Sequence, residues 1–286
     1  MTLGHRGWFN WMSDERYLKI AYRIKMGQKL HLDNPVTFSE KLQWLKLYDH
    51  NSQYTAMVDK YAVKEFIAKR VGEEYVIPTL GVWKNTDEID FDSLPDKFIV
   101  KATHDSGSYA ICRSKDTFDF TSAKRRLKRC LRHNYYWGGR EWPYKNIEPK
   151  IIAEPLIEEP EKMKEFKFFC FNEEPVFFQS ITDRTHADGP ILQFHDINGV
   201  RLDIIDAVYK CRQGGPFELL PDNLEDLIRL SRILAKNTSF LRVDFFETDS
   251  RIYVGELTFF ESGGFCRFTP EEWNRRLGDW ITLPKH

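Results

Sequence analysis

Residues 241–258 read LRVDFFETDSRIYVGELT and decide the fold that we expect for this chain. From 241 to 246, apolar residues alternate with Arg242 and Asp244. From 252 to 258 the same period of two places Glu256 and Thr258 on one face. The residues between these segments are polar and turn-like, so the segments are predicted to be two strands of a hairpin. A register that sets Asp244 opposite Glu256 would place two carboxylates side by side.

This pair of carboxylates predicts a magnesium site. Two like charges facing each other across a strand pair cost about 0.2–1 kcal/mol unless something compensates them. Mg²⁺ is commonly held by one or two carboxylates together with substrate phosphates, and Arg242 beside them could grip a phosphate oxygen with its planar fork. A solvated outer sheet face is the commoner arrangement for an arbitrary Asp/Glu pair, but the rest of the sequence favours the metal site.

The composition is that of a soluble protein with room for two or three subdomains. Its 286 residues are 30% charged and 15% aromatic, and 42 Lys and Arg balance 43 Asp and Glu to a formal net charge of −1. This balance argues against a nucleic-acid partner. No stretch is long enough to span a bilayer and the start lacks an apolar signal core, so we expect a cytoplasmic protein. The five cysteines show no metal-binding spacing and are expected to be free, buried thiols.

The periodicity predicts an α+β fold with mainly antiparallel sheets. Thr37–Glu40 is a capping box that opens a helix, and one helix is predicted over residues 56–70. Asn223 is expected to cap a later helix, and Thr269 another that has Pro270 at its first position. A basic helix is predicted over residues 121–133, either as a solvated face or as a docking site for an acidic polymer. Further strands are predicted at 75–77, 81–83, 98–101, 150–154, 166–171 and 176–181.

A candidate phosphate loop follows the strand at 98–101. The strand ends in Lys101 and leads into His104-Asp-Ser-Gly-Ser108. Such a loop can present backbone N–H groups and a hydroxyl to phosphate oxygens while the lysine neutralises charge. Taken alone this signal is weak, because a histidine in a turn more often makes a local hydrogen bond.

A candidate adenine site follows the strand at 150–154. Pro155 has no N–H, so the backbone leaves the ladder directly after Glu154. Exposed backbone groups at such a break could read the edge of an adenine, and Glu158, Glu159 or Glu161 could accept the ribose hydroxyls. The alternative is an ordinary edge strand that enters an acidic surface loop.

Three further cations are candidate anion-binding residues. Lys167 is set apart from the apolar face of its strand and could reach phosphate, although surface lysines on strands are common. Arg184 ends the next strand, and Arg140 lies in the aromatic stretch 135–142. Either arginine could clamp an anionic substrate through its planar guanidinium.

In this order, the segments resemble the TupA-like ATP-grasp family, the group named for teichuronopeptide synthesis. The resemblance covers nearly the whole chain. It implies an ATP-grasp fold in which two α+β subdomains clasp ATP, preceded by a small helical N-terminal region. The expected boundaries are 1–55, 56–154 and 155–286. The resemblance rests on residues 37–49, 58–64, 77–83, 139–146, 166–171, 242–245, 255–259 and 268–273.

The resemblance also implies which residues bind ATP and magnesium. Lys60 or Lys64 would open the central subdomain, Lys101 would contact phosphate, and residues 104–108 would form a flap over the phosphates. Residues 154–157 would form the adenine hinge. The expected ATP-binding residues are Lys60, Lys64, Lys101, His104, Ser106, Gly107, Ser108, Glu154, Leu156, Ile157, Glu159 and Glu161, and the expected metal ligands are Asp244, Glu256 and Thr258.

Two positions depart from the family pattern. Asp105 lies in a flap that tends to be richer in glycine, which questions the flexibility of the flap. ATP-grasp enzymes favour Glu-x-Asn at the metal, whereas this chain has Glu256-Leu-Thr258. A threonine hydroxyl is a weaker ligand for Mg²⁺ than an amide oxygen.

The reaction implied by the resemblance is ATP-dependent ligation of a carboxylate to an amine through an acyl phosphate. The acceptor is expected to be a uronic acid of a surface polysaccharide or its precursor, the amine an amino acid or small amine, and polysaccharide-assembly enzymes possible partners. Arg140, Arg184 and Arg267 are candidates for binding the acceptor carboxylate. The expected catalytic residues are Lys101, Arg242, Lys167, Arg184, Arg140 and Arg267.

Three alternative functions stay open at this point. Asp90-Phe-Asp92 matches the Asp-x-Asp pattern of nucleotide-sugar glycosyltransferases, although it lies in an acidic loop and not after an apolar strand. A kinase that phosphorylates a sugar hydroxyl would use the same ATP site and release no free phosphate. A non-catalytic nucleotide-binding partner would bind ATP without turnover.

Overall fold

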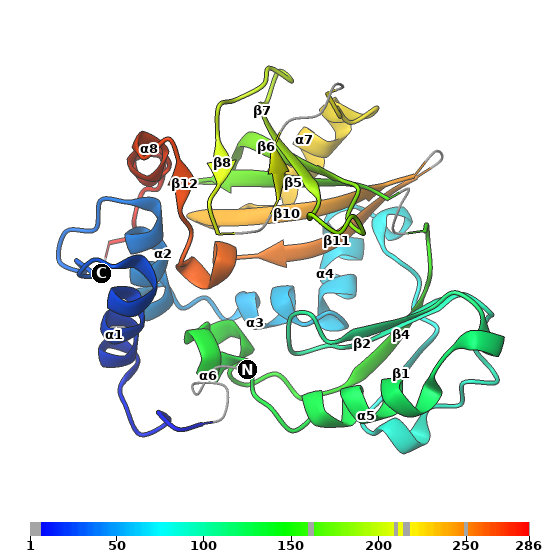
Figure 1. Ribbon diagram of the computed structural model, residues 1–286. Coiled ribbons are helices and arrows are strands. Elements are labelled where there is room, and N and C mark those ends of the chain that lie inside the picture. Colours follow the sequence, from blue (N-terminus) through cyan, green and yellow to red (C-terminus); the bar gives the residue numbers. More distant parts are fainter. Residues whose placement is uncertain (1–6, 160–162, 209–210, 214–217, 249–250, 286) are drawn as a thin grey trace. The chain divides into compact units, whose positions relative to one another are not determined.

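A computed structural model describes residues 7–159, 163–208, 211–213, 218–248 and 251–285. The chain forms two compact units (Figure 1). The first unit consists of Met1–Trp11, Asn51–Lys69 and Val76–Ile157, and the second of Met12–His50, Arg70–Tyr75 and Glu158–His286. The helical residues 12–50 therefore belong with the C-terminal half of the chain.

The first unit is built on a four-stranded antiparallel sheet with strand order β1-β4-β2-β3. Helix α5, Phe120–Cys130, packs on this sheet through Leu127, whose buried neighbours include Phe98 and Val100. Figure 1 shows α5 below the sheet. The strands are β1 (Gly81–Trp83), β2 (Phe98–Ala102), β3 (Tyr109–Cys112) and β4 (Ile151–Pro155), and the other helices are α3 (Gln53–Val58), α4 (Ala62–Val71) and α6 (Tyr136–Gly139).

The second unit is built on a six-stranded sheet with strand order β11-β10-β5-β6-β7-β9. Its neighbouring strands are antiparallel except for β7 and β9, and a separate pair joins β8 to β12. The strands are β5 (Lys164–Phe171), β6 (Glu174–Thr182), β7 (Ile191–Asp196), β8 (Ile205–Asp206), β9 (Arg212–Gln213), β10 (Phe240–Glu247), β11 (Ile252–Thr258) and β12 (Phe268–Thr269).

Phenylalanine side chains fill the core of the second unit. Phe169 stacks on Phe177 at 4.4 Å between ring centroids, and Phe38 packs edge-on against Phe240 at 5.0 Å. Phe38 opens α2, so this contact fixes the helix to the sheet. The helices of this unit are α1 (Asp14–Met26), α2 (Phe38–Tyr48), α7 (Leu224–Leu234) and α8 (Glu272–Trp280). Among the described residues, 3₁₀ helices lie at Glu73–Tyr75, Thr86–Glu88, Lys115–Thr117, Trp142–Tyr144 and Glu261–Gly264, the last labelled η6.

Most of the expected elements are confirmed. The capping box is present: the Thr37 hydroxyl accepts the Glu40 amide, and the Glu40 carboxylate accepts the Thr37 amide at 3.0 Å. The single helix expected over 56–70 is wrong, because the Asp59 side chain accepts the Tyr61 amide at 2.8 Å and starts α4 afresh after α3. The strand expected at 75–77 is also wrong, since a 3₁₀ helix ends at Tyr75.

The two expected later caps need correction. The Asn223 side chain makes no capping hydrogen bond, and the buried Glu247 carboxylate accepts the amides of Asp222 and Asn223 at 3.1 Å instead. Thr269 belongs to β12, where it pairs with Ile205, so α8 begins at Glu272 with Glu271 as its N-cap.

All five cysteines are free, as expected, and three of them are buried, whereas Cys130 and Cys211 are half-buried. None of the helices in the described ranges is long and apolar enough to cross a membrane.

Candidate nucleotide and metal site

The predicted hairpin is present as β10 and β11, and its register is the one on which the expected carboxylate pair depends. Asp244 pairs with Glu256 and Arg242 with Thr258, and a bulge follows Asp244. On the other side of β10, Asp244 pairs with Lys167 of β5. Asp244 therefore lies between a carboxylate and an ammonium group on the two neighbouring strands.

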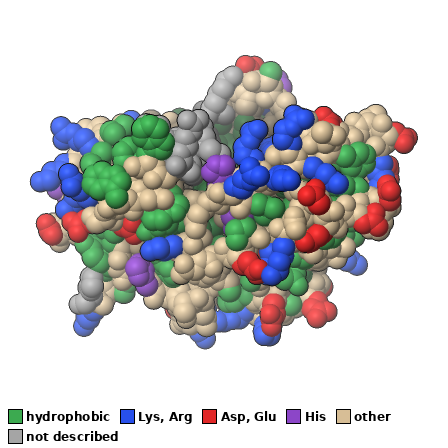
Figure 2. Space-filling model, turned by 90° about the horizontal axis from the view of Figure 1, so that it is seen from below, with side chains coloured by type: hydrophobic (Ala, Val, Ile, Leu, Met, Phe, Trp, Pro, Cys, Tyr) green, Lys and Arg blue, Asp and Glu red, His purple; other side chains and the backbone are tan. Residues whose placement is uncertain are grey.

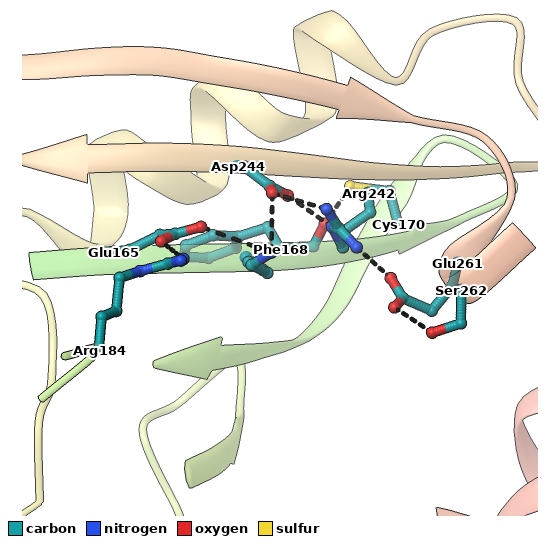
Figure 3. Close-up of polar contacts among 9 residues, drawn as sticks. Glu165, Phe168, Cys170, Arg184, Arg242, Asp244, Glu261 and Ser262 are labelled. Atoms are coloured by element: carbon teal, nitrogen blue, oxygen red, sulfur yellow. Dashed lines mark hydrogen bonds and ion pairs between the residues drawn. The ribbon is translucent and has the colours of Figure 1, made fainter. Parts of the chain in front are cut away.

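Arg242 holds Asp244 through a bidentate ion pair. Its Nε lies 2.6 Å from Oδ1 and its Nη2 lies 2.7 Å from Oδ2, and its Nη1 contacts Glu261 (Figure 3). Burial disfavours both charged forms, but the opposite charges outweigh it. The pKa of Arg242 is raised well above its usual value, mainly by Asp244 and then Glu261, and the pKa of Asp244 is lowered by Arg242 and Lys167.

Lys167 and Arg184 extend this network. The Lys167 ammonium lies 3.1 Å from Asp244 Oδ2 and 3.4 Å from Glu165 Oε1. Arg184 points at Glu165 from the end of β6 and forms an ion pair with it (Figure 3). Thus three cations and three carboxylates, mostly buried, lie in a row on one face of the second sheet.

Glu256 and Thr258 provide oxygens that protein groups leave available. The half-buried Glu256 carboxylate makes no hydrogen bond or ion pair with the residues that the structure describes. Thr258 Oγ1 is buried and has no hydrogen-bond partner among them. Carboxylate and hydroxyl oxygens are the hard ligands that Mg²⁺ takes. The donors therefore fit a magnesium ion that completes its shell with phosphate oxygens, although no three His, Cys, Asp or Glu side chains in the described ranges are placed to hold a metal by themselves.

Glu261 is a functional candidate that the sequence reasoning missed. It is 4% exposed, pairs with Arg242, and accepts the Ser262 hydroxyl at 3.0 Å. Ser262 and Gly263 have positive φ in η6, and buried Gln43 and Lys46 of α2 donate to carbonyl oxygens of this turn. The sequence signal that could have indicated Glu261 is an acidic residue just after a predicted strand, followed by Ser262 and two glycines.

In the first unit, two lysines share one buried carboxylate. Lys64 Nζ and Lys101 Nζ each lie 2.6 Å from an oxygen of Glu154, which is 4% exposed. Burial disfavours the Glu154 carboxylate, but Lys101 and Lys64 outweigh it and hold its pKa below the usual value. Burial lowers the pKa of Lys64 more than Glu154 raises it. The site thus holds two positive charges against one negative charge, and it can accept an anion.

The loop 104–108 is tied at both of its ends. The Lys60 ammonium donates to the Asp105 carbonyl, and the Ser108 hydroxyl donates to the Asp105 carboxylate. The His104 ring hydrogen-bonds the Cys130 carbonyl at 3.2 Å, a contact to the end of α5, 26 positions along the chain, and not within its own turn. Ser106 and Gly107 form the exposed tip, and Gly107 has φ +82°. Asp105, the residue that departs from the family pattern, therefore anchors the loop through these hydrogen bonds. That residues 104–108 act as a flap over the phosphates stays a prediction.

The expected adenine hinge follows β4, which ends at Pro155. The Leu156 amide donates to the Lys97 carbonyl at 3.4 Å, so this N–H is already engaged in the structure. Ile157 and Glu159 are half-buried, and Glu161 lies outside the described residues. The roles of Leu156, Ile157, Glu159 and Glu161 toward ATP stay predictions.

The three arginines expected at the acceptor carboxylate differ in their surroundings. Arg184 joins the second-unit network, whereas Arg267 is exposed and donates to the Met26 carbonyl at 2.8 Å. Arg140 is 1% exposed, lies 4.5 Å from the Trp137 ring centroid and donates to the Phe9 carbonyl at 2.7 Å. Arg140 thus has a structural contact, and its role as a clamp stays a prediction.

The Asp-x-Asp stretch forms a surface turn. Asp90 and Asp92 are exposed, and the Asp90 carboxylate accepts the Asp92 amide at 3.1 Å while Phe91 is buried in the core. This geometry explains the two acids as turn residues.

Comparison with known proteins identifies one matching family, described as TupA-like ATPgrasp, over residues 40–282. Solved structures that resemble this one include the D-alanine–D-alanine ligases of Bacillus anthracis (17% identity, 71% of this chain and 57% of that chain, TM-score 0.40) and Helicobacter pylori (16%, 86% and 69%, 0.45). Phosphoribosylglycinamide synthetase from Anaerococcus prevotii is a third (16%, 77% and 48%, 0.38). The chain thus spans about half to two thirds of the length of these proteins. No curated protein matches the sequence.

Proposed function

The chain belongs to the TupA-like ATP-grasp family, and from this premise we propose that it is an ATP-dependent ligase that joins a carboxylate to an amine. A substrate carboxylate attacks the γ-phosphorus of ATP, which gives an acyl phosphate and releases ADP. The amine nitrogen then attacks the acyl carbon, and inorganic phosphate leaves as the amide forms.

The observation that carries this proposal is the surroundings of Asp244. This carboxylate faces Glu256 on the neighbouring strand β11 and Lys167 on the neighbouring strand β5, and Arg242 forms a bidentate ion pair with it. A buried structural ion pair needs no second acid in register and no second cation. A site for a polyphosphate and a hard cation needs both, because metal and phosphate carry large opposite charges.

Asp244, Glu256 and Thr258 would hold magnesium, which would supply positive charge to offset the negative charge that develops on the phosphates. Arg242 and Lys167, which form ion pairs with Asp244 in the structure, would supply positive charge to the phosphates. Their pairing with Asp244 compensates these buried charges before ATP binds, which limits the cost of desolvation.

The first unit would act on the nucleotide through Lys101 and Lys64. Their shared partner Glu154 holds both ammonium groups in place at 2.6 Å, which orients them before the substrate arrives. Residues 104–108, which follow Lys101 in the chain, would cover the phosphates and exclude water.

Arg184 is the best placed of the three arginines to receive the acceptor carboxylate. It is partly exposed and already pairs with the carboxylate of Glu165 in the same network as Asp244. We place a uronic acid of a surface polysaccharide, or of its precursor, in this role, with an amino acid or small amine as the second substrate. Polysaccharide-assembly enzymes in the cytoplasm are the partners this function would have.

Product analysis tests the proposal. The protein is incubated with Mg-ATP, a panel of amino acids, and glucuronate, galacturonate or polygalacturonate as the acceptor, and ADP, phosphate and amide are measured. The proposal predicts equimolar ADP and phosphate, and a hydroxamate when hydroxylamine replaces the amine. ADP without phosphate would indicate a kinase, and release of UDP from a UDP-sugar without ATP would indicate a glycosyltransferase; either result contradicts a ligase.

A further inference from the structure

Helix α5 carries a cationic surface that the proposed reaction does not use. Between residues 120 and 133 the chain has six Lys or Arg and no Asp or Glu, whereas the net charge of the whole chain is −1. Five of the six side chains are exposed. Figure 2, which views the side on which α5 lies in Figure 1, shows a group of Lys and Arg side chains. The α5 cationic surface consists of Lys124, Arg125, Arg126, Lys128, Arg129 and Arg132.

The protein leaves these charges almost uncompensated. Among the described residues, their one ion pair joins Lys128 to Asp87 at 3.8 Å, and both partners are exposed. Helix α7, in contrast, opens with two acids that accompany its arginines. Like charges three or four positions apart, such as Arg125 and Arg129, destabilise a helix. The helix dipole favours cations only in the last turn, so it does not account for the whole run.

The α5 cationic surface adjoins the loop 104–108. Arg126 Nη2 donates to the Gly107 carbonyl at 2.8 Å, and its guanidinium lies 5.6 Å from the centroid of the Tyr109 ring. Burial raises the pKa of the Cys130 thiol, which donates to the Ser108 hydroxyl at 2.9 Å. An anion on α5 therefore lies next to the loop that we expect at the phosphates.

We propose that the α5 cationic surface binds a linear polymer of carboxylate-bearing sugars, so that the acceptor reaches the enzyme as a polyanion and not as a small free acid. Five of the six cations lie between residues 124 and 129, over about 7.5 Å of the axis of α5, and Arg132 follows in the turn after the helix. A monomeric acid would contact one or two of them, whereas a polymer with repeated carboxylates would engage several of them at once. This inference rests on the proposed function for the choice of carboxylate as the repeated charge.

Binding of polygalacturonate to the full chain without ATP tests this inference. The variant Arg125→Gln/Arg129→Gln/Arg132→Gln removes three exposed charges and spares Arg126 and Cys130, which contact the loop. Arg16→Gln/Arg23→Gln/Lys29→Gln removes three exposed charges elsewhere and is the matched control. We expect the wild type and the control to bind alike, the α5 variant to bind on the order of tenfold more weakly, and all binding to weaken with salt.

Polyphosphate and phosphatidylglycerol vesicles serve as competing anions. Absence of wild-type binding to polygalacturonate, equal loss in both triple variants, or binding to the phosphate polymer or the vesicles but not to polygalacturonate would overturn the inference. A Mg-ATP thermal shift is recorded on the same proteins. A Mg-ATP shift without polymer binding would contradict the inference about α5 and leave the proposed ligase supported. Polymer binding to α5 without a Mg-ATP shift would contradict the proposed ligase and leave the inference about the surface supported.

Discussion

At the scale of single residues, each of the two units contains a buried carboxylate that forms ion pairs with two cations. Glu154 forms ion pairs with Lys64 and Lys101, and Asp244 forms ion pairs with Arg242 and Lys167. Removing one member of such a set leaves an uncompensated buried charge, which costs more than the intact set contributes.

Replacing Glu154 tests this at acid pH. Its pKa is lower in the folded protein than its ordinary value of 4.5, so the unfolded state binds the proton first as the pH falls. The stability that Glu154 contributes is therefore complete above about pH 5.5 and is lost as the pH falls through 4.5 and through the lower folded pKa. We expect Glu154→Gln to cost about 3–5 kcal/mol at pH 7 and to flatten the loss of stability between pH 6 and pH 3.

Urea denaturation at several pH values measures this effect, with exposed Glu225→Gln as the control. An unchanged slope of stability against pH in Glu154→Gln would show that the two lysines do not hold this carboxylate ionised.

Replacing Thr258 is expected to weaken metal binding without lowering the stability of the protein. Its hydroxyl is buried without a hydrogen-bond partner in the described part of the chain, so Thr258→Val removes an unsatisfied polar group at nearly constant volume. We expect the apo protein to be equally stable or slightly more stable. The Mg²⁺ concentration that half-saturates the ATP-induced thermal shift should rise in Thr258→Val and fall in Thr258→Asn. Identical Mg²⁺ dependence in all three proteins would remove Thr258 from the metal ligands.

At the scale of elements, local patterns predicted the hairpin but not the long-range contacts around it. The period-two alternation of residues 241–258 placed Arg242 with Asp244 and Glu256 with Thr258 on shared faces, but it left the register open, and the structure has the register that sets Asp244 opposite Glu256. Glu261 and the cap of α7 by Glu247 were missed, because both depend on residues that meet only in the folded chain. The break between α3 and α4 was missed because the Asp59 cap interrupts an otherwise continuous helical pattern.

Packing of α8 on the start of α2 is an element-scale contact with a sharp test. A Cβ added at Gly278 would lie 2.1 Å from the Val36 carbonyl oxygen, a backbone atom that cannot turn away. We expect Gly278→Ala to destabilise the protein by about 3 kcal/mol, seen as a lower midpoint of urea unfolding. Asp279→Ala, at the exposed neighbouring position, is the control. Equal midpoints of urea unfolding for the two variants would show that α2 and α8 can move apart at little cost in stability.

At the scale of the whole molecule, the family resemblance predicted the ATP-grasp class and the α+β content, and both are confirmed. The assignment of residues 12–50 to the second unit does not follow from local sequence. It depends on contacts such as the buried Ser39 hydroxyl donating to the Gly264 carbonyl, 225 positions away. No periodicity within residues 12–50 carries that information.

The most direct measurement of the central claim is thermal unfolding of the wild type, Glu256→Gln and the control Glu225→Gln, with Mg-ATP and separately with UDP-sugars. A ligand at about 100 times its dissociation constant adds about 2.7 kcal/mol to the free energy of unfolding. The proposed site predicts a shift with Mg-ATP in the wild type and the control that is much smaller in Glu256→Gln. A shift with a UDP-sugar alone, equal in all three proteins, would contradict an ATP and magnesium site at Asp244 and Glu256.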